Sequence, residues 1–120
     1  GDRTWRLQVQ HGLPHAGYGG ATTKNHLDAA PRYRMGFGEW YLIHQVITPD
    51  KVKIYLNGQK ITDQEINSVS LNGSGLVMIG GNSDKPNYHF LGDIGEAGLF
   101  KRALKEEEIT EMYELGKFKE

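Results

Sequence analysis

Residues 51–61 read KVKIYLNGQKI, a run of alternating side chains that meets an Asn-Gly pair and then starts back. The apolar residues from Val52 to Leu56 fall on one face, because successive side chains of a strand point to opposite sides. Asn57 and Gly58 tolerate the positive φ angles of a type I′ turn, which predicts a reversal and antiparallel pairing. The stretch therefore predicts a β-hairpin of an antiparallel β-protein with one wet face. That wet face is expected to carry Lys51, Lys53 and Tyr55.

Composition limits both the size and the partners of the chain. Its 120 residues suffice for one domain with a single modest core. The 14 Lys and Arg and 15 Asp and Glu leave a formal net charge of -1, so no general attraction to nucleic acid or to an anionic membrane is expected. The absence of cysteine excludes disulfides, thiolate catalysis and zinc-thiolate sites. No apolar run approaches the roughly 20 residues of a membrane span.

The first strand expected from the sequence spans residues 5–10, where apolar and polar side chains alternate. This alternation places Trp5, Leu7 and Val9 toward the core. From residue 11 to 31 the pattern gives way to Gly, Pro, Asn, Asp and Thr, so mostly loop is expected there.

Three apolar stretches predict strands in the interior of the sheets. They are residues 40–47, 76–79 and 90–100. The first two are apolar on both faces, as strands covered on both sides are, and the third is punctuated by glycines. We expect all three to be central strands.

One short helix is predicted near the end of the chain, stopped by Gly116. Three glutamates at 106–108 occupy its first turn, where the helix dipole favours negative charge, although Lys105 is a poor N-cap and predicts fraying. The charge run is typical of a solvated helix start, and an acidic binding surface is the alternative. The apolar face of the helix is expected to consist of Leu104, Ile109, Met112, Tyr113 and Leu115.

Three segments in a fixed order resemble the laminin G-like or concanavalin A-like jelly rolls of lectins and glucanases. They are residues 40–59, which run from a tryptophan into the hairpin, 77–82, which read VMIGGN, and 90–109, which read FLGDIGEAGLFKRALKEEEI. The resemblance implies an all-β fold, an antiparallel β-sandwich of the jelly-roll type with one short C-terminal helix. The chain departs from the family pattern at Gly95, where an acidic residue is usual, and at Lys105, where a capping serine is usual.

The resemblance also implies that residues 1–120 are a single domain without its N-terminal strands. Members of the family place further strands before the position of Trp5, and one of them pairs with the strand near Phe100. Without those strands, backbone groups and apolar faces would lie uncovered. We therefore expect that the parent protein or a second copy of the chain fills the gap.

The spacing of carboxylates indicates whether the chain can act as a glucanase. Glucanases that resemble this fold carry two carboxylates an even number of residues apart on one strand, so that both face the sugar bond. Asp93 and Glu96 are three residues apart, which argues against such a pair. A lyase stays open as an alternative, because His, Tyr and Arg can serve as base, acid and charge neutraliser on an acidic sugar. The residues that would serve are His11, His15, Tyr18, His26, Arg32, Tyr33 and Arg34.

Metal chemistry has weaker support. The five histidines show no ligand spacing such as H-E-x-x-H. His44 falls in the middle of a predicted strand, where a hydrogen-bonded core histidine is the favoured interpretation over a ligand. Calcium would suit the oxygens of Asn82 and Asp84, but two such residues do not define a site.

Binding a sugar needs an aromatic ring for stacking and planar polar groups for the hydroxyls. Residues 81–89 read GNSDKPNYH and form a predicted loop between two apolar strands, where binding residues tend to lie. The alternative is that its Asn and Asp side chains build turns. The candidate ligand-binding residues are Asn82, Asp84, Asn87, Tyr88 and His89, with His15 and Tyr18.

These observations favour a non-catalytic recognition module that binds carbohydrate or glycoconjugates within a larger secreted or surface protein. An extracellular or cell-surface location follows from the resemblance alone. Two alternatives stay open: a polysaccharide-degrading enzyme, either a lyase or a glycosidase, and an adhesive or structural domain that binds protein.

Overall fold

The computed structural model describes residues 5–10, 12–18, 26–28, 30–48, 50–65 and 92–116. The predicted strand over 76–79 lies outside these ranges. The described elements are β1 (Trp5–Gln10), β2 (Leu13–Tyr18), β3 (His26–Asp28), η1 (Pro31–Tyr33), β4 (Ile43–Ile47), β5 (Lys51–Leu56), β6 (Gln59–Glu65) and α1 (Glu106–Gly116).

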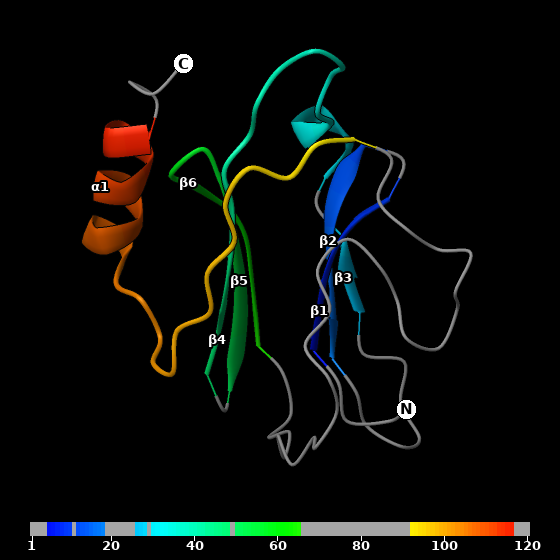
Figure 1. Ribbon diagram of the computed structural model, residues 1–120. Coiled ribbons are helices and arrows are strands. Elements are labelled where there is room, and N and C mark those ends of the chain that lie inside the picture. The colour runs from blue at the N-terminus through cyan, green and yellow to red at the C-terminus, as the bar shows by residue number, and fades with distance from the viewer. Residues whose placement is uncertain are drawn as a thin grey trace.

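The described strands form two antiparallel sheets with the orders β1-β2-β3 and β4-β5-β6. The sheets approach each other where β2 lies against β5. Helix α1 lies on the other side of the second sheet, so that the layers run helix, sheet, sheet (Figure 1). The antiparallel β-sandwich and its C-terminal helix were both predicted, and the full jelly-roll connectivity stays a prediction.

The hairpin forms as the sequence predicts. Asn57 and Gly58 have φ angles of 51° and 81°, which are the two positive values that a type I′ turn requires. Asn57 also fixes the entry to β4, since its Oδ1 accepts from the Leu42 N–H at 2.9 Å and its own N–H donates to the Leu42 carbonyl at 2.8 Å. The turn thereby joins β5, β6 and the start of β4 into one unit.

Strand β5 is buried on both faces. Val52 and Ile54 are 0% exposed on one face, and Tyr55 is 2% exposed on the other. The prediction of a wet face is therefore wrong at Tyr55, because α1 covers it. The helix-side core consists of Val46, Tyr55, Leu104 and Ile109, with Met112 packed against it.

Two predicted central strands are not central among the described residues. Strand β4 begins only at Ile43 and pairs with β5 alone, and its burial at Val46 comes from the helix side. Residues 92–100 form no strand and are exposed. Three glycines in this segment weaken extended pairing, and it pairs with none of the described strands.

The first sheet also differs from the prediction. Strands β2 and β3 occupy part of the region expected to be loop, because the chain reverses at Gly12, with a φ of 78°, and pairs back onto β1. Leu7 and Val9 are 43% and 39% exposed rather than buried. The predicted burial of these two side chains is therefore wrong, although Val9 lies opposite the fully buried Pro14 of the neighbouring strand.

Replacing Gly58 with alanine should destabilise the hairpin more than the same change at Gly38. Both glycines have φ near 80°, which costs an alanine about 1 to 2 kcal/mol. A Cβ at Gly58 would in addition lie 3.1 Å from the Cβ of Tyr113, whereas one at Gly38 meets nothing within 4 Å. Urea unfolding of the two variants measures the difference, and equal losses would contradict the packing of α1 on the turn.

Candidate functional site

An aromatic loop, residues 33–41, connects the two sheets. It follows η1, a single 3₁₀ turn that starts at Pro31, whose fixed φ suits a first helical position. The Met35 N–H donates to the Gly12 carbonyl at 2.7 Å, which ties the loop to the β1–β2 turn. At its other end the loop meets Leu42, which Asn57 holds. Both ends of the aromatic loop are therefore anchored on the sandwich.

The hydroxyl of Tyr41 organises the middle of the loop. It accepts a hydrogen bond from the Gly36 N–H at 2.9 Å and donates one to Glu39 Oε2 at 2.8 Å. Gly38, with a φ of 80°, supplies the left-handed residue of the bend. The short segment from Gly36 to Tyr41 is thus closed by its own side chains.

This closed segment presents two aromatic rings to solvent. Phe37 is fully exposed and Trp40 is 59% exposed. The Trp40 ring lies against the backbone of Gly95, where an added Cβ would sit 3.4 Å from the Trp40 Cζ3. The absence of an acidic side chain at position 95 thereby leaves room for the indole.

The aromatic loop also carries polar groups. The Arg32 guanidinium, one residue before the loop, lies 4.9 Å from the centroid of the Tyr33 ring and donates to the Tyr33 hydroxyl at 3.0 Å. The Glu39 carboxylate is on the exposed side of the bend. An exposed indole suits stacking on a sugar ring, and charged groups such as the Glu39 carboxylate suit hydrogen bonds to its hydroxyls.

The sequence-predicted candidates are placed unevenly. Asn82, Asp84, Asn87, Tyr88 and His89 lie outside the described residues, and their role stays a prediction. His15 and Tyr18 lie three positions apart on β2, within a strand rather than the loop that was expected. The sequence reasoning did not select Phe37 and Trp40, although four aromatic residues within nine positions, spaced by two glycines, were a visible signal.

The residues of the lyase alternative come from several elements. His15 and Tyr18 are on β2, His26 is on β3, and Arg32 and Tyr33 are on η1 and engage each other. His11 lies outside the described residues. A lyase therefore stays the alternative that the sequence analysis left open.

Acidic groups do not gather into a metal site in the part of the chain that the structure describes. No cluster of three or more His, Asp or Glu side chains is present there. Asp93 and Glu96 are both exposed on a segment that is not a strand, so the strand-spacing argument does not apply to them. No helix among the described residues is long and apolar enough to cross a membrane.

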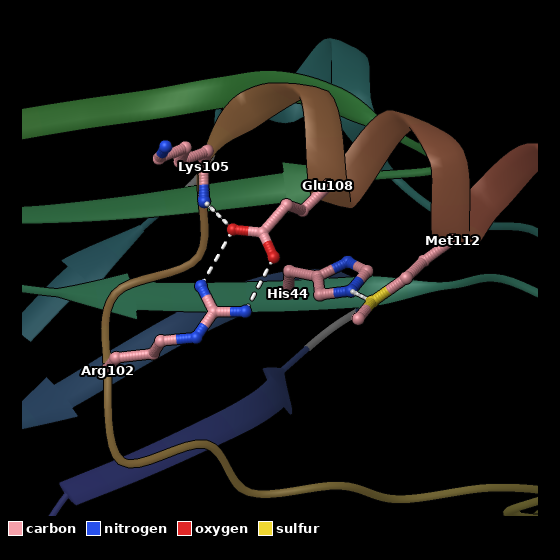
Figure 2. Close-up of polar contacts among 5 residues, drawn as sticks. All are labelled: His44, Arg102, Lys105, Glu108 and Met112. Carbon is pink, nitrogen blue, oxygen red and sulfur yellow. Dashed lines mark hydrogen bonds and ion pairs between the residues drawn. The ribbon is translucent and has the colours of Figure 1, made fainter.

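The start of α1 shows what replaces the usual capping serine. Glu108 Oε1 accepts from the Lys105 N–H at 3.0 Å, which is the reciprocal half of a capping box. Arg102 grips the same carboxylate with two hydrogen bonds of 2.7 and 2.6 Å (Figure 2). These bonds lower the pKa of Glu108 to about 2. The fraying expected from Lys105 is opposed by this arrangement.

A second polar group joins α1 to the hairpin. Glu106 Oε1 lies 3.1 Å from Lys60 Nζ and 3.3 Å from the Tyr55 hydroxyl, which donates to it. The hydrogen bond from Lys60 lowers the pKa of Glu106. The pKa of Tyr55 is raised, mainly by burial and to a smaller extent by the negative charge of Glu106. Two of the three glutamates of the charge run therefore fasten the helix, and neither the solvated start nor the acidic surface describes them fully.

The apolar face of α1 is mostly as predicted. Leu104 and Ile109 are buried, and Met112 and Tyr113 are half-buried. Leu115 is exposed, contrary to prediction, because the helix ends one residue later.

Comparison with known proteins identifies the family. A family model for laminin G domains of the concanavalin A-like lectin/glucanases superfamily matches residues 1–110. The chain belongs to this superfamily. No curated protein matches it.

A solved structure shares the fold of this concanavalin A-like domain. It is a 2.1 Å crystal structure of part of an S-layer domain-containing protein from Clostridium thermocellum, with a TM-score of 0.58 and 20% sequence identity. The match covers 93% of this chain and 57% of that one. The chain thus spans just over half the length of its structural neighbour.

Replacing Glu108 with glutamine should destabilise the domain in a pH-dependent way. Because the pKa of Glu108 falls from 4.5 to about 2 on folding, its stabilisation is complete above pH 4.5 and is lost as the pH falls toward 2. Thermal midpoints of the wild type and Glu108→Gln should therefore differ at pH 6 and converge near pH 2. Glu107→Gln, in the same turn, is the matched control, and an equal effect of both changes would contradict the role of Arg102.

Proposed function

We propose that this domain is a non-catalytic recognition module that binds carbohydrate through its aromatic loop. The observation that carries the proposal is the exposed Trp40 ring, backed by Gly95 and held on a loop that Tyr41 closes. Such a ring is fixed before binding, so little conformational entropy is lost when a sugar stacks on it.

The surroundings of the indole support a sugar over a flat protein surface. Phe37 and Trp40 are close in sequence and both exposed, and Glu39 lies between them. Aromatic rings interleaved with a carboxylate suit the alternating C–H faces and hydroxyls of a saccharide. A domain that only binds protein is the second candidate, favoured by the exposed apolar residues Leu99 and Phe100.

A surface-associated setting is part of the proposal. The superfamily includes lectins by name, and the structural neighbour is an S-layer domain-containing protein. We propose that this domain belongs to a larger secreted or surface protein. The predicted loop of residues 81–89 is a second place where the same sugar would bind, with Asn82 and Asp84 as ligands of a calcium ion.

Removing the indole should weaken sugar binding. Trp40→Ala is expected to weaken binding to any glycan found on an array by about tenfold or more, as truncation of a central aromatic contact does. Phe37→Ala should weaken it less. Leu115→Ala, at an exposed leucine on α1, is the control and should leave binding unchanged.

The same array decides between the two loops. If Tyr88→Ala and Asp84→Ala abolish binding while Trp40→Ala leaves it unchanged, the site lies in residues 81–89 and the aromatic loop is excluded. If that binding also requires added calcium, the calcium ion lies in the same loop. The absence of a signal on every glycan would overturn the carbohydrate proposal.

We also propose that a further β-segment, supplied by the parent protein or by a second copy, covers the edge of the first sheet at β1, which pairs with no described strand other than β2. Leu7 and Val9 lie on the face of buried Pro14 but are themselves half-exposed. Their methyl groups should be protected from a soluble paramagnetic probe in the intact parent protein or in an oligomer. Full accessibility in both would contradict the proposal.

A further inference from the structure

His44 lies at the contact between the second sheet and α1. It is directly opposite Tyr55 in the β4–β5 register, on the face that the helix covers. Its Nε2 atom is 3.4 Å from the Sδ atom of Met112 (Figure 2). The ring therefore meets a weak acceptor that belongs to the helix, and His44 is half-buried beside the helix-side core rather than a member of it.

The other ring nitrogen has no such contact. Nδ1 is buried and meets no hydrogen-bond partner among the described residues. If the neutral ring carries its proton on Nε2, where it can be donated to the thioether, Nδ1 holds a lone pair that nothing solvates. A proton that charges the ring must then arrive at Nδ1, a position with neither an acceptor nor water contact.

We propose that His44 is an acid-sensitive latch, whose protonation at Nδ1 releases α1 from the β4-β5-β6 sheet. The charged ring would need solvent on its Nδ1 side, and the half-buried packing of the helix denies it. Displacing α1 supplies that solvent. The thioether of Met112 offers little compensation, because it is a weak acceptor.

The nearby carboxylates of Glu106, Glu108 and Asp63 form ion pairs with Lys60 and Arg102. On α1, Glu108 is bound by Arg102 and Glu106 by Lys60. The sheet contributes Tyr55 and Lys53 from β5, and Lys60 and Asp63 from β6, which form an ion pair of 3.2 Å. Burial lowers the pKa of His44.

The lowered pKa of His44 determines how the stability of the docked helix changes with pH. Because the folded-state pKa lies below 6.5, the docked helix is fully stabilised above pH 6.5 and loses stability as the pH falls through the folded-state value. Glu108, with a pKa of about 2, keeps its charge over this range. Between pH 7 and 5, a change in the docking of α1 can therefore be attributed to His44 and not to protonation of Glu108 at the start of the helix.

Opening would expose a defined apolar surface. The helix-side core residues are Val46, Tyr55, Leu104 and Ile109. The inter-sheet residues Val52 and Ile54 are on the other face of β5 and would stay covered. The change is thus a local release of one layer and not an unfolding of the sandwich.

Amide hydrogen exchange of the whole domain, read by NMR between pH 7 and 5, tests the proposal. Protection factors of α1 should fall by about tenfold for each unit by which the folded and unfolded pKa values of His44 differ, while those of β5 stay unchanged. His44→Gln keeps a donor for Met112 but cannot titrate, and it should abolish the pH dependence.

Two results would overturn the latch. One is an equal loss of protection in α1 and β5, which would indicate global unfolding. The other, which needs no variant, is a titration of the His44 ring in the wild type with a pKa at or above 6.5. A His44→Gln variant that keeps the pH dependence would likewise assign it to another group.

Discussion

Burial of β5 from both sides is the constraint on which the rest of the structure depends. Val52 and Ile54 close the space between the sheets, and Tyr55 closes the space beneath α1. A strand covered on both faces fixes its register strongly, because a slip by one residue would exchange the two sets of side chains. The Asn57–Gly58 turn and the bonds from Asn57 to Leu42 then place β6 and β4 against it.

Apolar and charged contacts both hold the helix on the sheet, and they act at different residues. Ile109 and Leu104 supply the buried area, while Glu108 and Glu106 bind to Arg102 and Lys60 and set where the helix begins. His44 lies on the same layer, and its Nδ1 atom, like the Nε2 atom of the neighbouring Gln45, is buried without a hydrogen-bond partner among the described residues. The helix therefore covers β5, and it is the layer that we propose to be released when His44 is protonated.

Sequence patterns predicted the elements whose physics is local. The hairpin followed from alternation and an Asn-Gly pair, and the helix from its spacing, its acidic first turn and Gly116. The sequence patterns failed where contacts between distant segments determine burial or strand pairing. Tyr55 looked wet because its cover lies some fifty positions away in sequence, and β2 looked like loop because its Gly and Pro content hid a strand that pairs with β1. The exposure of Trp40 was missed, because a tryptophan at the head of an apolar run is typical of a core residue.

In the function that we propose, the aromatic loop carries recognition without a catalytic group. Its rings are presented by a short segment that Tyr41 and Gly38 shape and that the two sheets anchor. The scaffold supplies rigidity, and the loop supplies chemistry. Gly95 links the two, because the backbone there supports the indole of Trp40.

A NOESY spectrum of the methyl-labelled domain tests the central claim most directly. The account predicts contacts from the Ile54 methyl groups to protons of β2, and from the Ile109 methyl groups to the ring of Tyr55. Ile54 methyl groups without contacts to β2, or a Tyr55 ring without contacts to α1, would contradict a β5 that is buried between a sheet and a helix.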